Sequence, residues 1–237
     1  MKAFIEDEEF GKVYVELRRG MTSVRFTYRP DGSLLMRAPQ GISVDDLQRM
    51  IDMNRLQLRK LPKPSQPELR VGQMIECAFG CRVLISIGDL RPGYASTQWA
   101  GNDMLVKVHK DLNLADTACS QFVSNMISQA LVPMARTLLL PFAQQVADNL
   151  GLKPAGFEVG GGMRKLGHCT SKGIIRLSRN LMFLPEELVR YIICHELAHL
   201  THMNHSPQFH ALCDQYTDGK EKELEQQLRQ FRFPIMK

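Results

Sequence analysis

The segment from Tyr191 to His205, YIICHELAHLTHMNH, limits the possible folds of this chain more than any other stretch. His195 and His199 stand four residues apart in apolar sequence with helical spacing, and such residues project from one helix face with Cβ atoms about 5–6 Å apart. Two imidazoles so placed can bind one metal ion. Glu196 is turned about 100° around the helix, where its carboxylate can reach a water on that ion without replacing it. The pattern predicts a buried helix with two metal ligands and a general base.

A catalytic zinc ion takes three protein ligands and keeps its fourth position open. The downstream candidates are His202, His205, His210 and Asp214. We favour His205, because the chain can leave the helix at about Asn204 and turn back before Ser206-Pro207 opens the next helix. His202 would lie a further turn along the axis, and His210 falls inside the following helix. From the residues alone, His205 is the first candidate for the third metal ligand, and the other three residues stay possible.

The first half of the chain has the patterns of a sheet. Residues 12–38 alternate between apolar and polar, with a turn at Pro30-Asp31-Gly32, and predict a meander of antiparallel strands. Ser43 is a typical N-cap for a helix that extends to about Lys60, and three prolines within 61–67 predict a linker or surface crossing. A second strand-rich block follows. We therefore expect a β-rich N-terminal part, residues 1–112, with one helix at about 43–60.

The second half reads mainly as helix. Residues 114–150 predict two helices, or one helix kinked at Pro133 and Pro141, with Gly151 as the C-cap. Two strands at 156–164 and 173–178 precede a helix over 185–203 and another over 206–218. The expected fold is α+β, in which an antiparallel β-rich N-terminal half precedes a helical core, residues 113–237, with a small sheet.

Composition limits the class of protein. The chain has 237 residues, of which 44% are hydrophobic and 23% charged, enough for one large core or two small ones. We find no apolar run of about 18 residues and no basic-then-apolar leader, which argues against a membrane span or export and favours the cytoplasm. Six cysteines in a chain of this size are expected to be reduced thiols.

The net charge of +5 permits contact with nucleic acid without demanding it. The basic residues of the first half are expected to form a solvated helix face, with a nucleic-acid surface as the alternative; they are Arg49, Arg55, Arg59, Lys60 and Lys63.

The sequence HELAH from His195 to His199, followed by MNHSPQF from Met203 to Phe209, resembles the signature of the YgjP-like metallopeptidase family, which is related to the WLM and SprT-like zincins. The similarity extends to a hairpin with Gly167, Cys169, Thr170, Ser171, Gly173, Ile175 and Leu177, then Leu181 and Pro185, and loosely to Pro30-Asp31-Gly32, Ala38-Pro39 and Gly41. The chain departs from the family at Arg164 to Cys169, which lacks a tryptophan and has His168 in place of serine. It also departs at His210, where the family has tryptophan.

The resemblance implies a zincin-like core that hydrolyses peptide bonds in a peptide or protein substrate. It implies Zn²⁺ held by His195, His199 and His205, with Glu196 as the general base. It further implies a free strand edge for the substrate within Lys172–Ser178. An oxyanion donor is also needed, for which the candidates are His168, Arg164 and Tyr216.

Two other hypotheses belong to different classes of protein. One is a nucleic-acid-associated binding protein with a zincin core, and the other is a zinc-containing scaffold with little turnover. The oligomeric state does not follow from the sequence.

Overall fold

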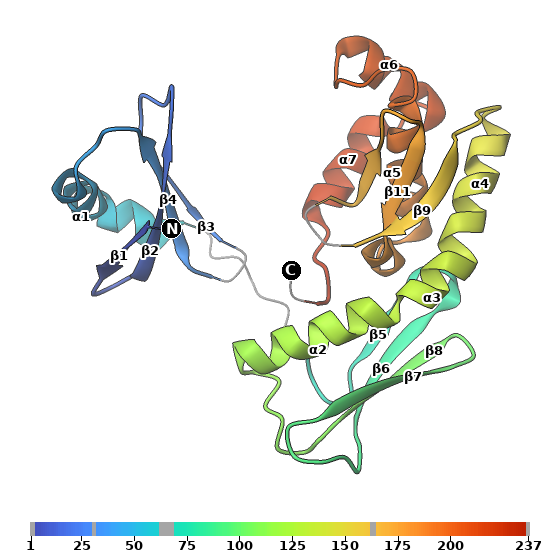
Figure 1. Cartoon of the computed structure of the whole chain (residues 1–237), viewed down its shortest axis with the longest axis horizontal. Helices are drawn as coiled ribbons and strands as arrows, with labels where there is room; N and C mark the ends of the chain where they lie inside the picture. The colour runs from blue at the N-terminus through green and yellow to red at the C-terminus, as the bar shows by residue number, and fades with distance from the viewer. Residues whose placement is uncertain (1–2, 30–31, 62–68, 162–164, 236–237) are drawn as a thin grey trace. The chain divides into compact units, whose positions relative to one another are not determined.

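The computed structural model describes residues 3–29, 32–61, 69–161 and 165–235. The chain divides into two compact units, Met1–Gln66 and Pro67–Lys237 (Figure 1). The boundary therefore lies in the proline-rich stretch and not at residue 112. The reason is packing, since Val83 and Val106 from the second strand block share one buried core with helix residues such as Ile127 and Leu139.

The first unit is a four-stranded sheet with one helix. Its elements are β1 (Ala3–Asp7), β2 (Gly11–Arg18), β3 (Arg25–Tyr28), β4 (Leu34–Pro39) and α1 (Val44–Lys60). The strand order is β1-β2-β4-β3, with β2 and β4 parallel and the other two pairs antiparallel. The expected antiparallel meander is thus wrong for β2 and β4. Alternation sets which face of a strand is buried, but it does not select the neighbouring strand.

The helix α1 agrees with its sequence prediction. The Ser43 hydroxyl accepts a hydrogen bond from the backbone N–H of Asp46, as an N-cap does. Leu47, Ile51 and Leu58 lie one or two turns apart and bury one face of α1 against the inner face of the sheet, which includes Val13 and Met36.

The second unit begins with another four-stranded sheet. Its strands are β5 (Met74–Glu76), β6 (Arg82–Ile87), β7 (Ala95–Ala100) and β8 (Asp103–Val108), in the order β5-β6-β8-β7. The pair β6 and β8 is parallel, so this sheet is mixed as well. Trp99 on β7 donates a hydrogen bond from Nε1 to the carbonyl of Ala130 at 2.8 Å, which attaches the sheet to the helical run that follows.

That helical run is continuous from Thr117 to Asn149. It consists of α2 (Thr117–Ala130), α3 (Val132–Met134), a π-helical segment (Ala135–Leu139) and α4 (Leu140–Asn149). Pro133 and Pro141 lie at the first turns of α3 and α4, where a missing N–H is tolerated, and Gly151 has the left-handed φ of +68° that ends such a helix.

The run Thr117–Asn149 contains a window of 18 residues with a mean hydropathy of 1.3, which by length and composition alone is apolar enough to cross a membrane. The run also contains polar residues, so it is not an uninterrupted apolar stretch. A core helix passes the same test. Val123, Ile127 and Leu139 on one side are fully buried, whereas Asn125 and Gln129 on the other side are exposed. This one-sided burial is typical of a helix that packs on a protein core.

The last part of the second unit holds the small sheet and three helices. The elements are β9 (Gly156–Gly160), β10 (Gly167–Cys169), β11 (Ile174–Ser178), α5 (Glu186–Ala198), α6 (Pro207–Tyr216) and α7 (Glu221–Gln230). The sheet order is β10-β11-β9, with β10 antiparallel and β9 parallel to β11. The structure confirms the α+β class. It contains the hairpin β10–β11 that the family resemblance implied. It adds α7, which the sequence patterns did not predict, and it ends α5 five residues earlier than expected.

Candidate metal centre

The structure brings together the imidazoles of His195, His199 and His205. One ring nitrogen from each lies within 4.8 Å of the others. The Nε2 atoms of His195 and His205 are 3.1 Å apart, although ten residues separate them in the chain. We compared the positions of the histidine, cysteine, aspartate and glutamate side chains in the part of the chain that the structure describes. These three histidines are the group whose ligand atoms lie close enough together to hold one metal ion.

The end of α5 produces this convergence. His195 lies in the last turn of α5, and His199 is the C-cap residue. Regular helix ends at Ala198, and the N–H groups of Thr201 and His202 still bond to the carbonyl of Ala198. The last helical turn therefore extends to about His202, and the chain leaves the helix before Asn204, where we expected the exit. The turn needs no left-handed residue, because among the described non-glycine residues positive φ occurs at Phe79 and Asp218.

The turn also orients His199. Its Nδ1 is 2.9 Å from the carbonyl oxygen of His202. A carbonyl only accepts hydrogen bonds, so Nδ1 carries the proton and Nε2 keeps its lone pair. A backbone partner of this kind commonly fixes the tautomer of a metal-binding histidine. His202 therefore acts through its carbonyl, while its ring is not part of the cluster.

Phe209 forms the floor of the site. Its side chain is fully buried, and its ring centroid lies 4.9, 4.5 and 4.8 Å from those of His195, His199 and His205. The hydroxyl of Ser206 caps α6 by accepting a hydrogen bond from the N–H of Phe209 at 3.3 Å. This cap links the residue after His205 to the residue beneath all three rings. A structural role for Phe209 was not expected from the sequence. Its position three residues after the N-cap Ser206 could have indicated that it lies at the start of the helix, close to His205.

The environment of His195 and His205 favours their neutral form. Burial, followed by the neighbouring rings of His199 and His205, lowers the pKa of His195 to about 4. Burial and the ring of His199 also lower the pKa of His205. Neutral imidazoles offer the lone pair that a metal ion requires. The donor set, three imidazole nitrogens with one tautomer held by a carbonyl, fits a zinc ion.

Glu196 lies beside the cluster in a dry environment. Only 6% of the residue is exposed. Burial raises the pKa of its carboxyl to about 7, against the lowering effects of a hydrogen bond from the backbone N–H of Cys169 and the charge of Lys165. A carboxyl group with a pKa near 7 can both take up and release a proton at neutral pH.

Strand β10 passes directly over Glu196. A Cβ atom added to Gly167 would lie 2.7 Å from Glu196 Cδ, closer than any real side chain packs, so only glycine leaves room for this carboxylate. The expected free edge within Lys172–Ser178 is wrong, because β11 is paired on both sides. The edge strand next to α5 is β10.

The three expected oxyanion donors have different positions. His168 is exposed on β10 and lines a hollow of about 450 Å³ together with Lys165, Gly167 and Arg176. Tyr216 is half-buried at the end of α6, and its carbonyl accepts from the Cys194 thiol at 3.4 Å. Nothing among the described contacts joins Tyr216 to the histidine cluster. Arg164 lies outside the described residues.

A further pair borders the cluster. His210 Nδ1 is 2.7 Å from an oxygen of the buried Glu221, and the ring of His210 is 6.3 Å from that of His205. This pair could not be predicted from the sequence patterns, because Glu221 opens the unexpected helix α7.

The cysteines do not contribute ligands to the cluster. All six are free thiols. Cys194 and Cys213, which flank the site in the sequence, are fully buried, and burial raises the pKa of Cys194 to about 11. Their role is packing.

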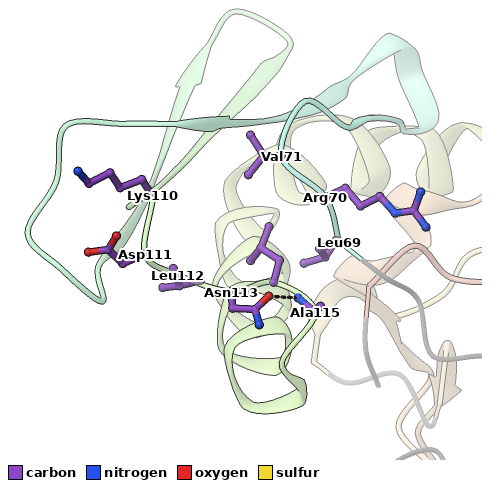
Figure 2. A pocket seen from close by; sticks show the side chains of 9 residues that line it. Leu69, Arg70, Val71, Lys110, Asp111, Leu112, Asn113 and Ala115 are labelled. Atoms are coloured by element: carbon purple, nitrogen blue, oxygen red, sulfur yellow. Dashed lines mark hydrogen bonds between the residues drawn. The ribbon is translucent and has the colours of Figure 1, made fainter.

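A second hollow of similar volume lies away from the histidines in the second unit. It is formed by Leu69–Val71 and by residues 110–115 (Figure 2). In Figure 2 the side chain of Arg70 extends in the opposite direction to those of Lys110 and Asp111, so the three charged groups do not converge on a common ligand.

Comparison with known proteins gives one family. The profile of the YgjP-like metallopeptidase domain matches residues 22–231. A search of solved structures finds the crystal structure of the metallopeptidase zymogen abylysin from Pyrococcus abyssi, with 28% identity over 36% of this chain and 87% of that chain and a TM-score of 0.32. No curated protein matches.

Proposed function

Since this chain belongs to the YgjP-like metallopeptidase family, we propose that it is a zinc-dependent peptidase in which Glu196 is the general base and His195, His199 and His205 are the zinc ligands. The observation that carries this proposal is the convergence of three imidazoles next in sequence to a buried carboxylate whose pKa is about 7. Three imidazoles and an open fourth position are a common zinc site in hydrolases.

The metal and the carboxylate have separate tasks. Bound zinc supplies Lewis-acid chemistry, which brings the pKa of a water toward about 7 and polarises a carbonyl. Glu196 accepts the proton of the attacking water at its carboxylate and later donates that proton to the leaving amine. Burial holds the carboxylate in place and keeps competing water away from it.

The free edge of β10 is suited to the substrate. The Ser178 N–H bonds to the carbonyl of Leu166, and the Thr170 N–H bonds to the carbonyl of Ile174, so these residues direct their backbone groups toward β11. Alternation in an antiparallel ladder then directs the backbone groups of Gly167 and Cys169 away from β11. The N–H of Cys169 bonds to Glu196, so a peptide would pair with the backbone of Gly167 and the carbonyl of Cys169. An extended peptide could add as a further strand along this edge, next to Glu196. We propose extended segments of peptides or unfolded proteins as the substrate class.

The test combines metal content with turnover. Purified wild-type protein should contain about one zinc ion per chain by elemental mass spectrometry, and it should cleave an unfolded protein substrate. His205→Ala should lose both zinc and activity. Glu196→Gln should keep zinc and lose activity.

Two results would contradict the proposal. Full zinc retention by His205→Ala would exclude His205 as a ligand. Unchanged turnover in Glu196→Gln would exclude its role as the base. If the wild-type protein binds zinc but cleaves no member of a broad peptide library, a scaffold role for the metal becomes the better explanation.

A further inference from the structure

The sheet of the first unit has a second face, on the side opposite α1. Side chains alternate between the two faces of a strand. Val13, Leu34 and Met36 point inward and pack with α1. Tyr14, Leu35 and Arg37, their neighbours in sequence, therefore belong to the other face. We call this face, with the outward residues of all four strands, the outer sheet face.

An apolar row crosses the outer sheet face. The strand registers align Phe4 with Tyr14, Tyr14 with Leu35, and Leu35 with Thr27. The rings of Phe4 and Tyr14 lie side by side, with centroids 6.3 Å apart, and Phe4 is 47% exposed. Phe4 is therefore the accessible ring of this row, whereas Tyr14 is half-buried and Leu35 is buried.

Cations stand over both rings. Lys12 Nζ is 5.0 Å from the centroid of Phe4, and Arg29 Cζ is 4.3 Å from the centroid of Tyr14. Such contacts hold positive charge beside an aromatic surface.

The next row carries an excess of positive charge. The register aligns Arg25 directly opposite Arg37, and like charges in this position destabilise a sheet. Glu16 is the carboxylate in this row, and it is shared by Arg37 at 3.1 Å and Arg18 at 3.0 Å. The cations of the outer sheet face are Lys12, Arg18, Arg25, Arg29 and Arg37, against the carboxylates Glu6 and Glu16. An anionic partner would relieve the repulsion between Arg25 and Arg37.

On the helix side of the same unit, in contrast, arginines are paired with carboxylates. Arg59 bonds to Glu9 at 2.6 Å, and Arg55 bonds to Asp7 at 2.8 Å and Asp52 at 2.6 Å. These ion pairs neutralise Arg55 and Arg59, two of the basic residues for which a nucleic-acid surface was the alternative interpretation. Another of those residues, Lys63, lies outside the described residues. The unbalanced positive charge is on the sheet.

We propose that the outer sheet face binds a single strand of nucleic acid, with a base stacked on Phe4 and phosphates paired with Arg18, Arg25 and Arg37. Exposed aromatic rings among cations are the means by which open sheets bind unpaired bases. A duplex hides the faces of its bases and could use the charges only. An acidic peptide would pair with the arginines but offers the ring of Phe4 no flat partner. This inference does not depend on the metal centre.

The experiment measures fluorescence anisotropy of a labelled single-stranded DNA of mixed sequence on titration with the full chain. We expect salt-dependent binding that is tighter for the single strand than for its duplex. Arg25→Glu should weaken binding by about tenfold and reduce the salt dependence. Phe4→Leu keeps an apolar side chain without the ring, and it should weaken binding by about tenfold for loss of stacking.

The matched control is Arg49→Glu, which makes the same change in net charge on the exposed side of α1 and should leave the affinity unchanged. Arg25 is exposed and has no ion pair among the described residues, so its variant should fold as the wild type does. The proposal fails if the single strand does not bind at low salt, or if the duplex or polyglutamate binds as tightly. It also fails if Arg49→Glu weakens binding as much as Arg25→Glu.

Discussion

Gly167 and Glu196 are in van der Waals contact across 29 residues of sequence, at a point where a Cβ atom would lie 2.7 Å from the carboxylate carbon. The contact limits the position of the carboxylate that we propose as the general base, because β10 closes the space above it. The edge on which we place the substrate and the base that acts on it are thereby held in one rigid arrangement.

We predict that Gly167→Ala displaces Glu196 and lowers turnover by about 100-fold, because a misplacement of about 1 Å has this effect on a reacting group. Zinc content should stay at the wild-type level, since the three histidines are untouched. Peptide cleavage and elemental analysis of the same preparation check both statements. Gly160→Ala on β9 is the matched control, because its Cβ would meet nothing nearer than 3.7 Å. Equal loss in both variants would mean that the contact with Glu196 has no special effect.

Phe209→Leu is expected to weaken zinc binding by about tenfold, the lower end of the range for residues that orient metal ligands. The ring of Phe209 supports all three histidine rings, and leucine would leave them free to tilt. Competition with a chromogenic chelator measures the affinity. Phe183→Leu, at a buried position of the same core, should lose similar stability, about 1–2 kcal/mol, and keep its zinc affinity. If the two variants bind zinc equally well, Phe209 is only a packing residue.

The two serine caps provide a third comparison. Ser206→Ala and Ser43→Ala should each cost about 1 kcal/mol of folding free energy, because each removes the acceptor for an otherwise unpaired N–H. Only Ser206 stands between His205 and Phe209, so only its loss should also reduce zinc affinity. Calorimetry of the metal-free protein and the chelator competition give the two quantities. A similar loss of affinity in Ser43→Ala would refute this assignment.

The lowered pKa of Asp7 predicts how the free energy of unfolding of the first unit depends on pH. Burial raises the pKa of Asp7, but hydrogen bonds from Arg55 and from the N–H groups of Phe10 and Glu9 lower it further, from 3.8 to about 2. The carboxylate therefore stabilises the folded state above pH 3.8, by about 2 kcal/mol, and this contribution is lost as the pH falls from 3.8 to about 2.

Asp7→Asn should be less stable than the wild type at pH 7, and the difference should shrink as the pH falls to about 2. Urea unfolding followed by circular dichroism at several pH values measures it. Glu8→Gln, at an exposed neighbouring position, should show no such difference. A constant gap between Asp7→Asn and the wild type at all pH values would contradict the assignment to this carboxylate.

Much of the local structure could be predicted from the residues. The caps at Ser43 and Ser206, the helix over 44–60 and the end of the long helical run at Gly151 agree with expectation. Each depends on groups within one or two turns of the chain, so the sequence contains the whole interaction. The four-residue spacing of His195 and His199 is of the same kind.

Contacts between distant segments were decided by the tertiary structure alone. Examples are the insertion of β4 between β2 and β3, the fit of Glu196 under Gly167 and the like-charged pair of Arg25 and Arg37. Alternation and helical spacing state which side of an element is buried, but they do not state which element covers it. The burial that raises the pKa of Glu196 and the register that aligns the arginines depend on that choice of partner, which only the packing of the whole unit makes.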